Sequence, residues 1–197
     1  MEFQKQKIRQ LNKPDKSNIG LWDLKIKDLC DKINQDKNYY TTSSCAGRIV
    51  LIKSLDKKAE NVFLFRTHEK ITLKELNKSL EEIKYNKLIE FKQTPCILHV
   101  ACFSLEKAQG LIDKAKFAGW KNSGIMSIKK RIIVELNSTE NLSFPIMNYK
   151  KKLVDNEFLK LSIELANKKL EKSWEKINKL LCSHQTYVVG NRKLVRV

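Results

Sequence analysis

A hydroxyl-rich segment, YYTTSSCAGR at residues 39–48, stands directly before an apolar run. The hydroxyl and backbone N–H groups of Thr41 to Ser44 can surround an anionic or zwitterionic ligand. Gly47 permits a positive φ or a close approach to the backbone, and Arg48 offers a planar fork to a carboxylate or a phosphate. A Thr/Ser-rich loop that bonds only its own backbone would have the same composition, so both interpretations stay open.

A second polar cluster is Trp120-Lys-Asn-Ser-Gly124, which follows a predicted helix and precedes a predicted strand. Trp120 could stack on a base or an adenine ring. Asn122 and Ser123 are residue types that read base edges or ribose hydroxyls. The alternative is an ordinary helix C-terminus and turn, with Trp120 packed in the core.

Two histidines are candidate bases. His99 lies in the apolar run LHVAC, and His68 follows the strand-like run that ends at Arg66. A lone histidine in such a run is more often a hydrogen-bonded structural residue. Cys96, His99 and Cys102 have a metal-like spacing, but alternation along a strand would put the two thiols on one face and the imidazole on the other. We therefore expect no metal site.

The composition favours a folded, polyanion-binding protein. The 197 residues carry a formal net charge of +17, and 42% of them are hydrophobic. Such a charge attracts nucleic acids, although a generally Lys-rich proteome would produce it too. No apolar run approaches the roughly 18 residues that span a bilayer, and no secretory signal is recognised, so we expect a cytoplasmic protein without membrane segments. The five scattered cysteines do not predict a disulfide framework.

The apolar spacing predicts helices and strands in irregular order. The expected helices run from Asn18 to just before Tyr39, from a capping box at Thr72, from Ser104 to Gly119, and from Val154 to Leu181. The expected strands are 49–53 and 62–66, which form a hairpin, and 88–91, 97–103, 125–128 and 131–136.

This order indicates a single α+β domain over residues 1–197, a mixed sheet with packed helices. No GxGxxG follows a first strand and no GxxxxGK[ST] occurs, so a Rossmann fold is not indicated. Residues 182–197 end in the basic tail TYVVGNRKLVRV, which is either a final strand or an ordered C-terminal arm.

Several motifs occur in a specific order. They are YYTTSSCAGRI at 39–49, a strand ending at His68, LHVAC at 98–102, NSGI at 122–125, FPI at 144–146, LVDNEFL at 153–159 and ELANKKL at 164–170. Together they resemble the tRNA wybutosine-synthesising methyltransferase family, including its archaeal members, over roughly residues 19–180. The chain departs from the family pattern at Ala46, where a second serine is usual, and at Phe103, where an arginine is usual.

The resemblance implies an S-adenosylmethionine-dependent tRNA N-methyltransferase of wyosine biosynthesis, on a non-Rossmann fold. The methyl group would go to N4 of the 4-demethylwyosine-type base derived from guanosine 37 of phenylalanine tRNA. We therefore expect S-adenosylmethionine as cofactor and the anticodon arm of tRNA-Phe as partner. The alternative is a non-catalytic RNA-binding protein, which the basic charge alone would favour.

The resemblance also suggests roles for the polar clusters. Two walls would hold the cofactor or the base, and we expect them to comprise Thr42, Ser43, Ser44, Gly47, Asn122, Ser123 and Gly124. Arg48 would pair with the methionine carboxylate or with an RNA phosphate. His99 or His68 would take the proton from the ring nitrogen. The extruded base would stack on Tyr39, Tyr40 or Trp120.

Overall fold

The computed structural model describes residues 2–13, 23–55 and 60–185. In chain order these residues form α1 (Glu2–Leu11), α2 (Leu24–Gln35), β1 (Tyr39–Cys45), β2 (Arg48–Lys53), β3 (Phe63–Thr67), α3 (Leu73–Glu82), β4 (Ile89–Thr94), β5 (Ile97–Cys102), α4 (Leu105–Phe117), β6 (Gly124–Ser127), β7 (Ile132–Asn137), β8 (Leu142–Asn148), β9 (Lys151–Lys152) and α5 (Asn156–Gln185).

The strands form two antiparallel sheets. The first sheet has the strand order β1-β5-β7-β6, and the second has the order β3-β2-β4-β8-β9. The chain passes from one sheet to the other between β1 and β2, where only Ala46 and Gly47 intervene, and again between β4 and β5, through Pro95 and Cys96. These short connections hold the two sheets next to each other.

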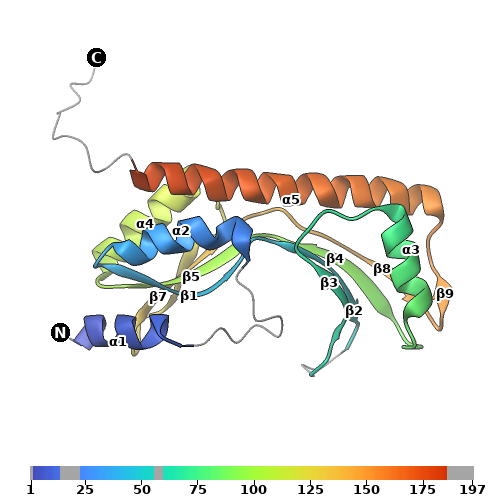
Figure 1. Cartoon of the computed structure of the whole chain (residues 1–197), viewed down its shortest axis with the longest axis horizontal. Coiled ribbons are helices and arrows are strands. Elements are labelled where there is room, and N and C mark those ends of the chain that lie inside the picture. The colour runs from blue at the N-terminus through green and yellow to red at the C-terminus, as the bar shows by residue number, and fades with distance from the viewer. Residues whose placement is uncertain (1, 14–22, 56–59, 186–197) are drawn as a thin grey trace, which may run out of the picture.

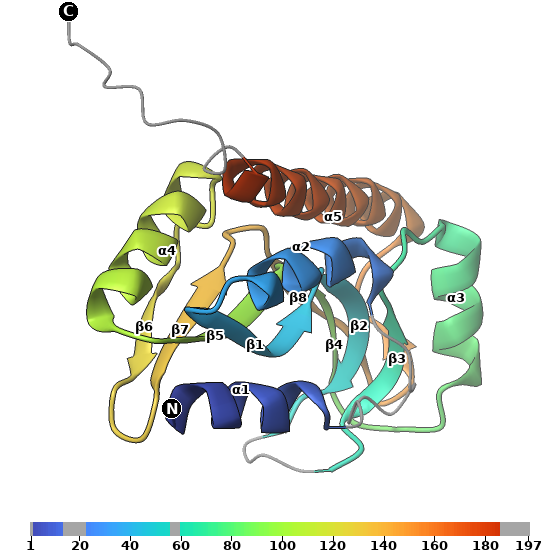
Figure 2. The ribbon, with the colours of Figure 1, turned by 60° about the vertical axis from the view of Figure 1, so that its left-hand side comes forward.

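Helices cover one face of both sheets (Figure 1). The long helix α5 runs above both sheets, α2 and α4 lie over the first sheet, and α3 packs against α5 at the far end of the second (Figures 1 and 2). Beneath them lie two hydrophobic cores. The first contains Trp120, Leu98 and Ile177, and the second contains Phe91 and Leu170, while Trp174 of α5 packs against both.

The opposite face carries few helices, and we call it the open face. Within the described ranges only α1 lies there, beneath β1 (Figures 1 and 2). Its Phe3 packs on Tyr40, with 5.1 Å between ring centroids. Strand side chains that alternate away from the two cores therefore point to this face.

The predicted α+β class and several local signals are confirmed. Strands β2 and β3 pair as the expected hairpin. Thr72 and Glu75 form both hydrogen bonds of a capping box, and the Ser104 side chain accepts from the Lys107 N–H at the start of α4. Gly119 ends α4 with a φ of 97°, a conformation that favours glycine.

Four elements differ from the sequence prediction, one of them the two-residue strand β9, which pairs with the end of β8. The segment before Arg48 is a strand, β1, rather than a loop. Its Thr41 points toward the helices, where the Asn34 side chain of α2 forms hydrogen bonds with the Thr41 hydroxyl and backbone N–H. A polar residue at an inward position hides the usual alternation of apolar and polar residues along a strand. Helix α1 was not expected from a lysine- and glutamine-rich stretch. Strand β8 contains Pro145, which normally argues against a strand, but Pro145 sits opposite Glu90 at a register shift, where proline is tolerated.

The first and last predicted helices differ from the structure at their outer ends. The predicted start at Asn18 lies outside the described ranges, and α2 follows Asp23. Helix α5 continues to Gln185, beyond the predicted end at Leu181. The rest of the predicted basic arm, residues 186–197, lies outside the described residues.

Candidate functional site

Four residues form one row across the first sheet. Ser43 of β1 is paired with His99 of β5, His99 with Glu135 of β7, and Glu135 with Gly124 of β6. Because neighbouring strands lie about 4.8 Å apart, the row spans about 14 Å. The imidazole of His99 has a partner on each side: Nδ1 lies 2.9 Å from the Ser43 Oγ, and Nε2 lies 2.9 Å from the Glu135 Oε2.

The row faces solvent on the open face. Leu98 and Val100 are fully buried in the first core, so His99 between them points the other way. The side chains of His99 and Glu135 are 24% and 34% exposed, and Ser43 is exposed. At Gly124 no atom lies within 4 Å of a Cβ placed there. A ligand can therefore reach Ser43 and Glu135 from solvent.

This arrangement can move a proton. An ionised Glu135 accepts the Nε2–H of a neutral His99, which leaves Nδ1 to accept the hydroxyl proton of Ser43. A proton taken up at Ser43 can then pass to His99, and the resulting imidazolium is stabilised by the carboxylate. The row thus has the parts of a general base with an exposed hydroxyl at its ligand-facing end.

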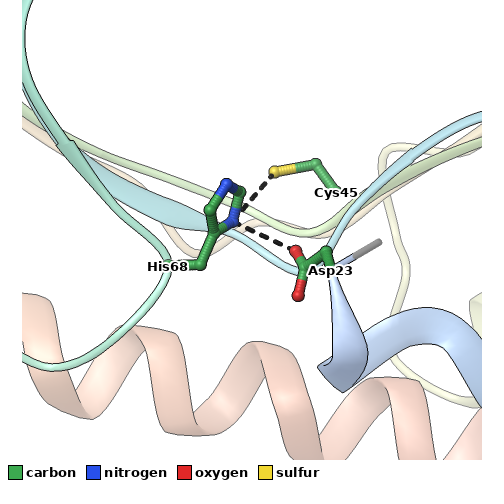
Figure 3. Close-up of side chains that lie close together, drawn as sticks. All are labelled: Asp23, Cys45 and His68. Carbon is green, nitrogen blue, oxygen red and sulfur yellow. Dashed lines mark hydrogen bonds and ion pairs between the residues drawn. The ribbon is translucent and has the colours of Figure 1, made fainter. Parts of the chain in front are cut away.

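A second cluster lies where β1 passes to the second sheet (Figure 3). Cys45 follows Ser43 by two residues and so shares its face. The Sγ of Cys45 is 3.9 Å from Nδ1 of His68, and the Oδ2 of Asp23 is 3.0 Å from the same nitrogen. The carbonyl oxygen of Gly47 also lies 3.0 Å from it, and the Ala46 N–H donates to the Asp23 Oδ2 at 2.7 Å. We call Asp23, Cys45 and His68 the junction cluster.

The charges of the junction cluster are set by these hydrogen bonds. The bond to Asp23, helped by that to Cys45, raises the pKa of His68 to about 10. Burial alone would raise the pKa of Asp23, but the hydrogen bonds from His68 and from the Ala46 N–H outweigh burial and lower it. At neutral pH the cluster therefore holds an aspartate–imidazolium ion pair. A protonated His68 donates hydrogen bonds and cannot accept a proton.

The junction cluster also has residue types that bind metals. In the described ranges it is the one group of three whose ligand atoms all lie within 4.8 Å of one another. Metal binding would require His68 to lose the Nδ1 proton that both Asp23 and the Gly47 carbonyl attract, so the contacts favour an ion pair. Cys96 and Cys102 are buried in the first core, on the face away from the His99 side chain.

Arg48 is the first residue of β2, the strand that follows Cys45 of the junction cluster in the chain. Ile49 and Leu51 are buried in the second core, so Arg48 and Val50 alternate to the open face. The guanidinium carbon of Arg48 lies 5.1 Å from the ring centroid of Phe63. Its Nε is buried and has no hydrogen-bond partner among the described residues. Thr42, Ser43 and Ser44 form the first predicted wall, which we call the hydroxyl wall. Arg48 is close to this wall in the chain but belongs to the second sheet.

The hydroxyl wall itself is divided between two faces. Thr42 donates its Oγ1 hydrogen to the His99 carbonyl at 3.3 Å, next to Ser43 in the row. Ser44 is paired with the buried Leu98 and so turns toward the helices, beside the thiol of Cys30. Ala46 is buried in the first core. A hydroxyl at position 46 would accordingly face the core rather than the open face.

The second predicted wall is mostly structural in its contacts. Ser123 is buried; its Oγ donates to the Trp120 carbonyl at 2.6 Å and accepts from the Asn137 N–H at 3.2 Å, which closes the turn. Asn122 is exposed beside it, and only Gly124 lies in the row. The two predicted walls therefore share one sheet, with β5 and β7 between them.

The aromatic residues expected to stack a base are buried. Trp120 is 0% exposed, and its Nε1 donates to the Lys176 carbonyl at 3.1 Å. Tyr39 and Tyr40 are 6% and 0% exposed. The expectation of base stacking on these three rings is therefore wrong, because a ligand cannot reach their faces.

Two residues of these clusters were missed from the sequence. Glu135 stands in the apolar run IIVEL, where a carboxylate in an otherwise strand-like stretch was a signal of an outward functional position. Asp23 directly precedes α2 and resembles an ordinary N-cap, but its side chain makes no cap hydrogen bond and instead turns to His68. Only the tertiary structure brings Asp23 to the junction.

Comparison with known proteins gives one consistent result. The model of the family described as methyltransferase TYW3 matches residues 3–185. A tRNA wybutosine-synthesizing protein 3 homolog from Danio rerio is 36% identical over 183 residues, which cover 90% of this chain and 72% of that protein. A tRNA(Phe) 7-((3-amino-3-carboxypropyl)-4-demethylwyosine(37)-N(4))-methyltransferase from Thermococcus sibiricus is 34% identical, with 91% of each chain covered.

Solved structures with a similar sequence have the same fold as this chain. The PH1069 protein from Pyrococcus horikoshii superposes with a TM-score of 0.83 at 32% identity, covering 91% of this chain and 92% of that one. A hypothetical protein from Aeropyrum pernix superposes with a TM-score of 0.72 at 27% identity, covering 82% and 96% of the two chains. The family model matches nearly the whole described chain, and the relatives are at least 34% identical over 72% and 91% of their own lengths, so the chain belongs to the TYW3 methyltransferase family.

Proposed function

We propose that this protein is the S-adenosylmethionine-dependent methyltransferase that methylates N4 of the 4-demethylwyosine-type base at position 37 of tRNA-Phe. Family membership and the names of the relatives support the reaction. The single structural observation that carries the proposal is the hydrogen-bonded row Ser43–His99–Glu135 on the open face. A ring nitrogen must lose its proton when it accepts a methyl group, and the row can take that proton.

The residues of the open face fit the proposed cofactor. S-adenosylmethionine supplies a methyl group that its sulfonium already activates. Its methionine end carries a carboxylate, which a cation of the open face can bind. His68 uses only Nδ1 among its described contacts, which leaves its Nε2–H for a carboxylate.

The two histidines then have different roles. His99 is the proton acceptor, acting through the exposed hydroxyl of Ser43. His68 is held protonated by Asp23 and acts as a cation rather than as a base. Thr42 and Gly47 shape the backbone between the two clusters, since Thr42 bonds to His99 and Gly47 bonds to His68. Gly124 leaves room at the end of the row for a planar base.

The substrate geometry also suits this surface. A base in a single-stranded anticodon loop can be turned out of the stack, and the exposed residues of the open face can then reach it. The net charge of +17 attracts the RNA backbone. No helix in the described residues is long and apolar enough to cross a membrane. The anticodon arm as the recognised region, and the cytoplasm as the location, remain predictions.

The decisive experiment uses the purified protein, labelled S-adenosylmethionine and tRNA-Phe from a strain that lacks this gene. Nucleoside mass analysis should show one added methyl group on the modified guanosine at position 37. Glu135→Gln keeps the shape of the side chain but removes the charge that stabilises the imidazolium, so we expect the rate to fall by about 10²-fold or more. Glu157→Gln, the same change at an exposed position of α5, should have no effect.

The outcomes separate the alternatives. A wild-type protein that binds the tRNA but shows neither saturable donor binding nor methyl transfer would be the non-catalytic RNA-binding protein. Equal rates for Glu135→Gln and Glu157→Gln would remove the row from the mechanism. If Glu135→Gln lowers the melting temperature so far that the protein is unfolded at the assay temperature, Glu135 acts structurally.

A further inference from the structure

Two arginines share one aromatic ring on the open face of the second sheet. The guanidinium carbons of Arg48 and Arg66 lie 5.1 Å and 5.6 Å from the ring centroid of Phe63. The strand register explains this: Val50 is paired with Arg66 on β3, so Arg48 and Arg66 come from adjacent strands and point to the same face. Phe63 itself is 43% exposed. The group is therefore reachable from solvent.

Within the described ranges this arginine pair has no counterion. Among the described residues neither guanidinium forms a hydrogen bond or an ion pair with a carboxylate, and the Nε of Arg48 is buried without a partner. The nearest strand neighbour of like charge, Lys92 opposite Val50, is already neutralised by Glu90 at 2.7 Å. Two like charges on one ring repel each other, and a buried donor without a partner is costly. An oxyanion bound to the N–H groups at the solvent-facing ends of both guanidiniums would relieve this repulsion.

We propose that Arg48, Phe63 and Arg66 form a binding site for a backbone phosphate of the RNA, apart from the row that performs the chemistry. This inference rests on the proposed function and names a contact that positions the tRNA. The two forks bind the phosphodiester oxygens. The ring of Phe63 holds both guanidiniums in place through cation–π contacts, which reduces the entropy lost on binding.

A carboxylate from the methyl donor would satisfy the arginines less well. That carboxylate shares a carbon atom with an ammonium, and the donor also carries a sulfonium, so its net charge is positive. Glu90, the carboxylate of the adjacent strand β4, is already bound to Lys92 and is not free for the ammonium. A phosphodiester carries a net negative charge and no cation. Charge complementarity therefore favours RNA over the donor as the source of the oxyanion.

The test measures binding of a phenylalanine tRNA transcript as a function of salt, with fluorescence anisotropy as the readout. Each phosphate contact contributes about 0.7 to the slope of log affinity against log salt for single-stranded RNA. Arg66→Gln should therefore reduce the slope by about 0.7 and weaken binding about tenfold at low salt. Phe63→Leu keeps both charges, so the slope should stay and the affinity should fall about threefold.

Two controls make the result specific. Lys160→Gln removes one positive charge from the exposed surface of α5, on the helix-covered side, and should leave the slope unchanged. Calorimetry with S-adenosylmethionine should give the same affinity for Arg66→Gln and wild type. A slope in Arg66→Gln equal to that of Lys160→Gln would overturn the phosphate site. Weaker donor binding by Arg66→Gln with an unchanged RNA slope would assign the arginines to the donor carboxylate and overturn the proposal as well.

These outcomes are independent of catalysis. A wild-type protein that transfers no methyl group, but whose RNA slope falls in Arg66→Gln, would disprove the proposed reaction and keep the phosphate site. A wild-type protein that methylates the tRNA, with no change in slope for Arg66→Gln, would support the proposed reaction and disprove the phosphate site.

Discussion

His68 and His99 show how two identical side chains acquire different chemistry from their neighbours. His99 lies between a hydroxyl and a carboxylate, each 2.9 Å from a different ring nitrogen, so it can pass a proton along the row. His68 directs one nitrogen at Asp23, Cys45 and the Gly47 carbonyl together. That nitrogen keeps its proton because an anion and a carbonyl both accept from it. The residue type alone could not distinguish these roles.

The ion pair between Asp23 and His68 predicts a dependence of stability on pH. The folded pKa of His68 is about 10, raised above the usual value near 6.5, so the pair stabilises the fold fully below about pH 6.5. This contribution is lost as the pH rises through about 10, because folding then no longer gains from the proton. We expect the urea midpoint of the wild type to fall between pH 6.5 and 10.

Asp23→Asn tests this prediction, because the neutral amide no longer holds the proton on His68. The variant should be less stable than the wild type at pH 6.5, and its stability should change less between pH 6.5 and 10. Asp31→Asn is a matched control, since Asp31 forms an exposed pair with Lys27 on α2. Parallel pH profiles for wild type and Asp23→Asn would show that His68 is not held as an imidazolium.

At the scale of elements, the turn between β1 and β2 sets the relation of the two clusters to Arg48. Gly47 has a φ of 99°, where an L side chain is strained. A Cβ there would lie 3.1 Å from the Leu170 Cδ2 and 3.1 Å from the Thr94 carbonyl oxygen. We expect Gly47→Ala to destabilise the protein by about 1–3 kcal/mol. We also expect it to lower the methylation rate of the folded protein, because the strain acts directly between Cys45 and Arg48.

Gly110→Ala is the control for this change. Gly110 is exposed in the middle of α4, and nothing lies within 4 Å of a Cβ placed there. Alanine should stabilise the helix by about 0.5–1 kcal/mol and leave activity unchanged. Denaturant unfolding and tRNA methylation of both variants give the comparison. A Gly47→Ala protein as stable and active as Gly110→Ala would show that the turn tolerates an ordinary residue.

The elements also show what the sequence could predict. The capping box at Thr72, the cap at Ser104 and the end of α4 at Gly119 are local signals, and each appears in the structure as expected. Strand β1 was hidden because its inward hydroxyls, those of Thr41 and Ser44, have partners on α2, which no local pattern reveals. Asp23 and Glu135 reach the site only through strand register and helix placement. The hydroxyl-rich segment and the two histidines were therefore recognisable, whereas Asp23 and Glu135 were not.

At the scale of the whole molecule, α5 joins the two halves. Its first half carries Leu159, Ile163 and Leu170 into the second core, and its second half carries Ile177 and Leu180 into the first. Trp174 lies between them and packs against both cores. The proton-transfer row lies on the first sheet and the arginine pair on the second, so this helix also fixes the distance between these two proposed sites.

This arrangement predicts that the two sheets unfold together. Leu170 is 0% exposed in the second core, so Leu170→Ala should cost about 2–5 kcal/mol. If α5 couples the cores, the amides of β5 and β7 in the first sheet should lose hydrogen-exchange protection by the same free energy as those of β4. Leu165→Ala, at an exposed position of the same helix, should change neither. Protection in β5 and β7 that survives Leu170→Ala would mean that each sheet folds with its own part of α5, and the distance between the row and the arginine pair would then be set by the Ala46–Gly47 turn instead.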